Sequence, residues 1–461
     1  MAICPIDSGR YGSEEIRKVF EEKSRLQKWL EVEAALARAN AKAGNIPEEA
    51  AKKITERATL DFVKIERVKA IEKEIDHDLM AMVRALSEVC GDSGKWVHFG
   101  ATSYDIEDTA LGLQIRDAIA IIEQDITELE VVLINLCKKY QDQVMVGRTH
   151  GVHATPITLG LKFAVWLREV SRHIQRLNQC KSRILVGKMS GAVGTGAGLG
   201  PRMLEIQEMV MKELDLKPVE VSTQIVQRDR HAEFISLLAL IASTLEKFAT
   251  EIRNLQRTEI QELTEPFRMD KQVGSSTMPQ KMNPIKCERV CSLAKLMRSL
   301  VIVSFENVSL WHERDLTNSA NERFIIPQGC ILMDEMLRTM TKILTGLNVF
   351  PENMRRNLEL GEGLIMSESI MLLLAKKEMG RQKAYELVRQ VAMQSVKTRK
   401  PFSELLLENQ TVREHLGEAE IRDALNPENY LGNTREIIDR AVKATVSERE
   451  QRGLPTATAT K

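Results

Sequence analysis

Hydrophobic residues recur three and four positions apart along much of the middle of the chain. In the most regular stretch the apolar positions are Ile115, Ile119, Ile122, Ile126, Leu129, Leu133, Leu136 and Tyr140. Similar stretches follow at 163–177, 234–255, 290–305 and 333–347. An apolar seam of period 3.5 with charged flanks predicts long helices that pack nearly parallel. We therefore expect an elongated five-helix bundle over residues 103–353.

The regions on either side of this bundle contain shorter amphipathic patterns. Glycine and proline interrupt them at Gly44–Pro47 and Gly91–Gly94, and again at Gly380, Pro401 and Pro427. Such residues end helices, and no strand-like alternation persists anywhere in the chain. The sequence thus predicts an all-α protein of three helical domains, which are an N-terminal domain (1–102), the central bundle (103–353) and a C-terminal domain (354–461).

Composition narrows the function classes. Of 461 residues, 43% are hydrophobic and 28% charged, which is typical of a globular chain and excludes an intrinsically disordered one. The 65 basic and 65 acidic side chains balance, so we expect neither nucleic acid nor an acidic membrane surface as a partner. Aromatic residues are only 4%, which favours helices over β-sandwiches.

The absence of targeting signals and the pattern of cysteines predict a cytoplasmic protein. The first twenty residues lack the apolar core of a secretory signal, and no apolar run approaches the ~18–20 residues of a membrane span. Seven scattered cysteines include no CxxC pair, which predicts reduced thiols and no metal site.

The segment Gly274–Pro284 (GSSTMPQKMNP) is the most unusual polar stretch. Glycine, two prolines and three hydroxyl residues predict a loop, and Asn283 followed by Pro284 is typical of an N-cap and the first residue of a helix. A serine, a lysine and free N–H groups at a helix start can together hold an anion. The same composition is equally typical of a flexible surface linker.

This segment resembles the signature loop of the fumarase/aspartase superfamily, whose members carry out fumarate-releasing or closely related eliminations. Two more segments resemble superfamily motifs in the expected order, Thr102–Thr109 (TSYDIEDT) and Gly147–Ala154 (GRTHGVHA). We therefore identify the chain as a member of this superfamily. The resemblance implies a helical-bundle enzyme that needs no cofactor and assembles as a homotetramer, with each active site drawn from three subunits.

Three further features resemble the purine branch of the superfamily. They are Arg10-Tyr11, the segment from Ser222 to His231, and Trp311–Ser319 with the following Arg323. The resemblance implies fumarate elimination from a succinylated purine nucleotide and from a succinylated imidazole ribotide. The alternatives are another fumarate-releasing enzyme, such as argininosuccinate lyase, and a non-catalytic structural protein built on the same scaffold.

The reaction removes a weakly acidic proton beside a carboxylate, so it needs a base, a cationic or N–H cradle, and an acid for the leaving nitrogen. By resemblance Ser275 is the base, with Ser276 as the alternative. A serine alkoxide requires stabilisation by loop amides, the helix N-terminus and a cation, for which Lys281 is the nearest candidate.

By resemblance His150 is the general acid, and Glu288 orients and charges its imidazole. Without the motif, His150 or the nearby His153 could each be an ordinary hydrogen-bonded core histidine. His77 resembles the histidine that assists on the phosphate or leaving-group side. The chain departs from the family at Asp76, where arginine is usual, and at Gln280 and Met282, where many relatives have histidine and arginine.

The remaining site residues are expected to hold the anionic nucleotide, because arginine forks and N–H or O–H donors suit phosphate and carboxylate groups. They are Arg10, Tyr11, Asp78, Thr102, Ser103, Gln224, Asn283, Arg314, Ser319 and Arg323. A glycine-rich run at 190–200 does not match a dinucleotide-binding motif, since no strand precedes it and Leu199 breaks the spacing. By resemblance it is a loop that folds over the site.

Overall fold

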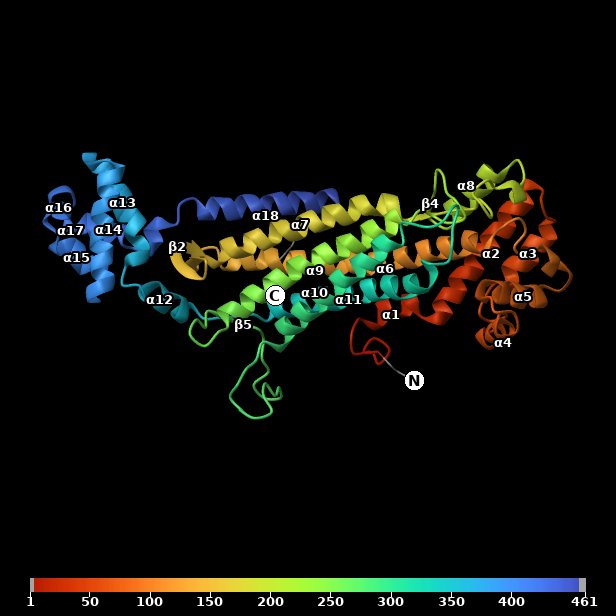
Figure 1. Cartoon of the computed structure of the whole chain (residues 1–461), viewed down its shortest axis with the longest axis horizontal. Helices are drawn as coiled ribbons and strands as arrows, with labels where there is room; N and C mark the ends of the chain where they lie inside the picture. The colour runs from red at the N-terminus through yellow and green to blue at the C-terminus, as the bar shows by residue number, and fades with distance from the viewer. Residues whose placement is uncertain (1–3, 456–461) are drawn as a thin grey trace. The chain divides into compact units, whose positions relative to one another are not determined.

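The computed structural model describes residues 4–455, which form two compact units. Unit 1 contains residues 4–127, 173–246 and 290–339, and unit 2 contains residues 128–172, 247–289 and 340–455. Five long helices run through the described residues (Figure 1), and the division between the two units falls inside each of these helices. They are α6 (Ser103–Lys139), α7 (Leu159–Ile184), α9 (Asp229–Leu255), α10 (Ile285–Glu306) and α11 (Ser319–Thr345).

These five helices contain all five stretches of heptad spacing, so the all-α fold class with its central five-helix bundle is confirmed. The seam positions are buried as the pattern predicts. In unit 1, Ile122, Phe234 and Met336 are all 0% exposed. Burying such a side chain fully contributes about 1.5–3 kcal/mol, so long repeated seams stabilise each helix far beyond its intrinsic propensity. The borders predicted for three domains stay a prediction.

Unit 1 also contains the shorter N-terminal helices and the elements around residues 186–218. Trp29, Leu30 and Met82 are among the residues of a second apolar core there. The elements are α1 (Glu14–Phe20), α2 (Glu22–Ala43), α3 (Glu48–Arg57), α4 (Ile65–Ile75), α5 (Asp78–Cys90), the 3₁₀ turns 91–96 and 197–199, α8 (Met203–Glu213), and the parallel strand pair β3 (Val186–Gly187) and β4 (Lys217–Pro218).

In unit 2, β1 (Val144–Thr149) and β2 (Val152–Thr158) form an antiparallel hairpin. The expectation that no strand occurs was wrong here. Val144, Val146, Thr155 and Ile157 are β-branched, and a two-residue turn joins the strands, which is a hairpin signal. The register shift between Val146 and Arg148 breaks the alternation of side chains, so the pattern is weak in the sequence.

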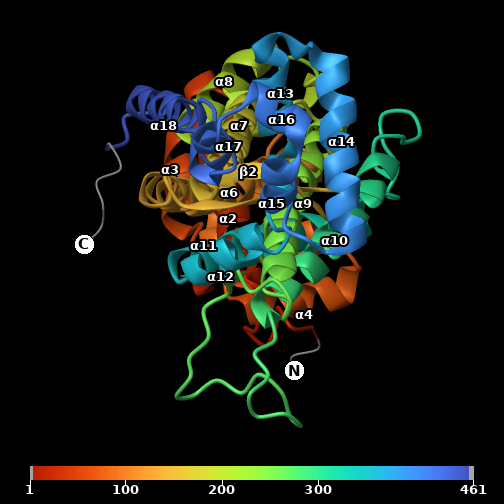
Figure 2. The ribbon, with the colours of Figure 1, turned by 90° about the vertical axis from the view of Figure 1, so that its left-hand side faces the viewer.

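The rest of unit 2 follows α11. Helices α13 to α17 form a compact cluster around Ile370, Leu374, Phe402 and Leu406 (Figure 2). The elements are β5 (Leu263–Thr264), its antiparallel partner β6 (Asn348–Val349), α12 (Pro351–Glu359), a 3₁₀ turn (364–366), α13 (Ser367–Leu374), a π turn (375–379), α14 (Arg381–Thr398), α15 (Phe402–Glu408), α16 (Gln410–His415), α17 (Glu418–Ala424), a 3₁₀ turn (427–430) and α18 (Thr434–Gln451).

All seven cysteines lie outside disulfide bonds, and six of them are buried while Cys4 is exposed. Burial raises the pKa of Cys90 to about 11 and that of Cys137 to about 12, which keeps both as unreactive thiols. Across residues 4–455, no helix combines the length and apolar character that a membrane crossing requires.

Candidate active site

One pocket of unit 1, with a volume of ≈ 620 Å³, gathers seven of the residues expected to bind substrate together with His77, which is expected to assist in catalysis. We call it the polar pocket. The eight residues are His77, Asp78, Thr102, Ser103, Gln224, Arg314, Ser319 and Arg323. They come from the starts of α5, α6 and α11 and from two loops, so helix N-termini and loops converge on one hollow.

Two of these residues begin α5. His77 is the N-cap, where its Nδ1 accepts a hydrogen bond from the N–H of Met80 at 3.4 Å. Asp78 follows in the first turn, and its Oδ2 lies 2.7 Å from Nη2 of Arg323 on α11. The preceding Asp76 has φ 52° as the C-cap of α4 and also lines the pocket. The left-handed backbone thus turns the chain between the two helices, which is a structural role for this departure from the family.

Arg314 is held flat on one wall of the polar pocket. Its guanidinium carbon lies 3.5 Å from the ring centroid of Tyr104, and its Nη1 donates to Oε1 of Gln224 at 3.2 Å. Its Nε and Nη2 are buried without a hydrogen-bond partner among the described residues. Because buried N–H donors without acceptors are costly, an anionic group that reached these two nitrogens would be stabilised by charge-assisted hydrogen bonds.

A buried ion cluster lies behind this wall. All five N–H groups of Arg228 are bonded: they reach both oxygens of Asp108, both oxygens of Glu322 and the carbonyl of Val226 at 2.6–3.0 Å. Burial alone raises the pKa of Glu322, but Arg228 and His231 outweigh it and hold that pKa at about 2. The cluster joins α6 to α11 and so fixes Tyr104 relative to Ser319, whose Oγ accepts a bond from the tyrosine hydroxyl at 3.1 Å.

Asp105, in the same motif, holds the glycine-rich segment. Its carboxylate accepts the N–H groups of Ser190 and Gly191 and pairs with Lys188, and both charged side chains are 0% exposed. The segment packs closely on its neighbours, because a Cβ on Gly194 would meet the carbonyl oxygen of Ser222 at 2.1 Å. Since Ser222 and Gln224 belong to one loop, this contact fixes the backbone that presents Gln224 to the pocket.

Arg10 and Tyr11 do not line the polar pocket. They lie in the segment before α1, where Arg10 is exposed and stacks over the Tyr11 ring at 5.9 Å. The N-cap Ser13 binds Asp334 of α11 and anchors this segment. Arg10 and Tyr11 therefore do not contribute to the polar pocket of their own chain, and their role in substrate binding stays a prediction.

The signature loop (274–284) belongs to unit 2 and projects away from β5 (Figure 1). Ser275 Oγ accepts the N–H groups of Thr277 at 3.2 Å and Met278 at 3.0 Å. Asn283 closes the loop by donating to the carbonyl of Gly274 at 2.8 Å. The backbone at Gly274 approaches the backbone at Lys281 so closely that a Cβ on Gly274 would lie 2.1 Å from the carbonyl oxygen of Lys281. Lys281, Asn283 and Glu288 line a second hollow, on unit 2.

The start of α10 differs from the expectation. The helix begins at Ile285, and Pro284 rather than Asn283 provides the carbonyl for its first turn, by accepting from Glu288 N at 2.9 Å. The N–H groups of Lys286 and Cys287, in the first turn of α10, donate to the buried carboxylate of Glu265 at 3.2 and 2.9 Å. Glu265 therefore occupies the helix N-terminus, so the loop amides are the N–H groups that remain for Ser275.

His150 sits at the tip of the β1–β2 hairpin, in unit 2. Its φ is 54° and that of Gly151 is 75°, so both turn residues adopt the left-handed conformation of a type I′ turn. This conformation is strained for histidine, which is a feature of functional positions. Arg148 fixes the hairpin through two bonds of 2.9 and 2.7 Å to the fully buried Glu262.

His150 is exposed, and no hydrogen bond or ion pair joins it to Glu288 within the described part of this chain. The expected pairing of these two residues is thus not made inside one chain. Burial and then Arg148 lower the pKa of the neighbouring His153, which favours its neutral form. Across residues 4–455, no three or more His, Cys, Asp or Glu side chains are grouped so that they could hold a metal ion.

Tyr104, Glu107 and Arg228 have no role predicted from the sequence, although all three line the cavities of unit 1. The motif Thr102–Thr109 contains a spacing that could have identified Tyr104 and Glu107. Tyr104, Glu107, Asp108 and Leu111 are three or four residues apart, so they share one face of α6. A helix start that places aromatic and acidic residues on a single face is a candidate pocket wall rather than a solvated surface.

Comparisons with known proteins show the family of the chain. The family model described as Lyase matches residues 9–297, and the model described as Adenylosuccinate lyase C-terminus matches residues 363–441. A curated adenylosuccinate lyase from Pyrococcus abyssi is 57% identical over 98% of this chain and 100% of its own length. The one from Methanothermobacter thermautotrophicus is 49% identical over 96% and 99%.

Solved structures show the same fold. A fumarate lyase from Mesorhizobium sp. BNC1 superimposes with a TM-score of 0.87 at 34% identity, covering 94% of this chain and 98% of its own. A 3-carboxy-cis,cis-muconate lactonizing enzyme from Pseudomonas putida gives 0.88 at 33% identity, covering 96% and 99%. The chain therefore belongs to the lyase family and, within it, to the adenylosuccinate lyases. The resemblance inferred from the three loop motifs is confirmed, and the chain is an enzyme of the lyase class.

Proposed function

We propose that this enzyme catalyses β-elimination of fumarate from adenylosuccinate, giving AMP, and from succinyl-aminoimidazole-carboxamide ribotide, giving aminoimidazole-carboxamide ribotide. The observation that carries the proposal is Arg314, which lines the same pocket as Arg323 and has two buried donors without acceptors. Guanidinium groups arranged in this way suit the phosphate and carboxylate groups of such substrates.

In the proposed mechanism Ser275 takes the proton from the carbon beside one carboxylate. The electron pair of that C–H bond forms the new C=C bond, and the C–N bond on the next carbon breaks. His150 gives its proton to the departing nitrogen, so fumarate and the amino product leave. The N–H groups of Thr277 and Met278, which already bond Ser275 Oγ, support its alkoxide form, and Lys281 supplies positive charge.

We propose further that the active site is shared between subunits of a homotetramer. The polar pocket is lined by Arg314 and Arg323 but also by acidic residues, and Arg323 is already paired with Asp78. A multiply anionic substrate needs more positive charge than this pocket offers. Unit 1 also exposes large apolar side chains on its long helices, which is typical of subunit interfaces; they are Leu240, Leu296, Ile302, Phe305 and Phe324.

Mixing two inactive variants tests the shared site. If Ser275 and His150 act from different chains, exchange of subunits between Ser275→Ala and His150→Gln tetramers is expected to regenerate about a quarter of the wild-type sites, the share that receives both native residues. The rate of fumarate release is measured after subunit exchange has been verified with tagged chains. Exchange without any recovery of activity contradicts the composite site.

A direct assay tests the activity. We expect the purified enzyme to convert adenylosuccinate to AMP, followed by ultraviolet absorbance, while argininosuccinate in a parallel reaction stays unchanged. Turnover of argininosuccinate alone would instead establish the other fumarate-releasing activity. Turnover of neither substrate would support a non-catalytic role on the same scaffold. A cytoplasmic location, without membrane or nucleic-acid partners, stays a prediction.

A further inference from the structure

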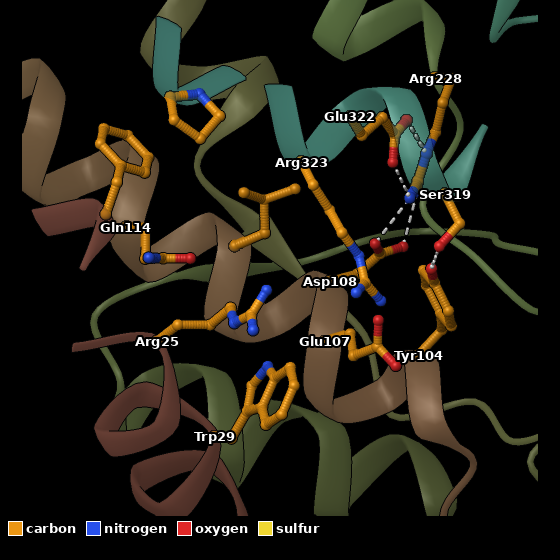
Figure 3. Close-up of a pocket in the computed structure, with 13 residues that line it drawn as sticks. Arg25, Trp29, Tyr104, Glu107, Asp108, Gln114, Arg228, Ser319, Glu322 and Arg323 are labelled. Atoms are coloured by element: carbon orange, nitrogen blue, oxygen red, sulfur yellow. Dashed lines mark hydrogen bonds and ion pairs between the residues drawn. The ribbon is translucent and has the colours of Figure 1, made fainter. Parts of the chain in front are cut away.

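A second, smaller cavity of ≈ 130 Å³ adjoins the polar pocket in unit 1. Tyr104, Glu107, Ser319 and Arg323 line both cavities, so these four side chains form the wall between them. Figure 3 shows Glu107 on α6 and Arg323 on α11 extending toward the same cavity. Glu107 therefore stands next to one of the two arginines proposed to bind the substrate.

Glu107 differs from the two other carboxylates of its motif. Asp105 accepts bonds from Lys188 and from backbone N–H groups, and Asp108 accepts bonds from Arg228. Glu107 accepts no hydrogen bond and joins no ion pair within residues 4–455. Its carboxyl group is thus free to bond a molecule that enters the cavity.

Acidic groups surround Glu107 from several elements. Asp78 begins α5, Asp108 follows on α6, Glu322 lies on α11, and Glu72, Asp76 and Asp315 line the polar pocket. Asp78 is paired with Arg323, whereas Asp108 and Glu322 share Arg228, so much of this negative charge is already compensated.

Basic groups also surround Glu107. Arg323 and Arg314 lie in the polar pocket with His77, Arg228 is fully bonded within the buried cluster, and Arg25 stacks over Trp29 at 5.1 Å. Burial, Asp78 and Asp108 raise the pKa of Glu107, while Arg323 and Arg314 lower it, and the balance lies at about 7.

We propose that Glu107 is a proton-dependent substrate-binding group, which donates a hydrogen bond to an anionic group of the substrate when neutral and competes with that group for Arg314 and Arg323 when ionised. The proposal rests on the proposed function, since it takes an anionic nucleotide as the ligand. Because the pKa of Glu107 is about 7, half of these groups are ionised at pH 7, and binding at that pH draws about half a proton per site from solvent onto Glu107. Affinity is highest below the pKa of Glu107 and decreases as the pH rises through it.

The pH dependence of KM tests this role. For the wild type, ionisation of Glu107 raises the KM for adenylosuccinate by about tenfold between pH 6 and pH 8. Glu107→Gln keeps the size of the side chain and cannot ionise, so its KM lacks this tenfold rise. Glu74→Gln, at an exposed position on α4 that lines neither cavity, follows the wild type. The substrate phosphate, whose second pKa is about 6, titrates equally in all three proteins and cancels in their ratios.

Calorimetry with AMP separates this inference from the proposed function. Binding of AMP at pH 7 to the wild type, measured in two buffers of different ionisation enthalpy, takes up more protons than binding to Glu107→Gln. If this difference is found and adenylosuccinate is not turned over, the role of Glu107 stands and the proposed reaction fails. If turnover occurs but KM has the same pH dependence in wild type and Glu107→Gln, the role of Glu107 is overturned. Failure of AMP to bind the wild type also overturns it.

Discussion

Replacement of Ser275 by alanine is expected to lower kcat by about 10²–10⁴-fold, the usual contribution of a general base, while changing KM little. The structure favours Ser275 for this role because its Oγ already accepts two backbone N–H groups, at 3.2 and 3.0 Å. Those groups sit where negative charge on the oxygen needs support, and they cost no rearrangement during the reaction. The measurement is steady-state kinetics of fumarate release at several substrate concentrations.

Ser276 provides the matched control for this experiment. It is the next residue in the same loop and is exposed, and its hydroxyl makes no hydrogen bond in the described part of the chain. Ser276→Ala is expected to keep kcat within a few-fold of the wild type. A large loss in Ser276→Ala together with a near-normal Ser275→Ala would move the base to Ser276, the alternative that the sequence alone leaves open.

Replacement of Arg228 by methionine is expected to lower the free energy of unfolding by about 3–5 kcal/mol, because it leaves Asp108 and Glu322 buried without their shared cation. Arg228 is 2% exposed and all five of its N–H groups are used, so neither water nor another side chain can take its place. Urea unfolding at a fixed protein concentration measures the loss, since assembly makes the stability concentration-dependent.

The pH dependence of this loss follows from the two carboxylates. In the wild type the pKa of Glu322, about 2, lies below the unfolded value of about 4.3, so its stabilising effect is present above that value and is lost as the pH falls toward 2. In Arg228→Met the unpaired buried carboxylates hold their protons more tightly, and their ionisation destabilises the fold as the pH rises. The difference between the two proteins is therefore larger at pH 8 than at pH 5.5. Arg230→Met, which removes a partly exposed arginine two residues away, is expected to cost less than about 1 kcal/mol.

The long helices could be predicted from the sequence because their information is local and repeated. A seam such as Ile115 to Tyr140 contains eight apolar positions at one period, so a single irregular position cannot hide it. The hairpin of β1 and β2 was missed because each strand is short and a register shift interrupts the alternation at Gly147. His150 was recognised from its motif, whereas its exposed, left-handed position at the hairpin tip depends on pairing that a one-dimensional pattern does not contain.

The sequence predicted which residues lie together in the pocket better than it predicted how they are arranged. Eight residues between His77 and Arg323 that were named from the motifs do line one pocket, whereas their roles in binding and catalysis stay a prediction. The role of Glu265 at the start of α10 was not predictable, because it lies about twenty residues earlier and no local spacing links it to Lys286 or Cys287. The same holds for Arg228, which looks like an ordinary surface arginine until α6 and α11 place Asp108 and Glu322 around it.

The distribution of thiols makes the chain convenient for spectroscopy. Cys4 is exposed, whereas the other six cysteines are buried, with burial raising the pKa of Cys90, Cys137, Cys180 and Cys330. A maleimide dye therefore reacts first with Cys4, and no cysteine has to be removed by mutagenesis beforehand. Donor- and acceptor-labelled preparations can then report on the exchange of chains in real time through energy transfer, in the same cuvette in which fumarate release is followed.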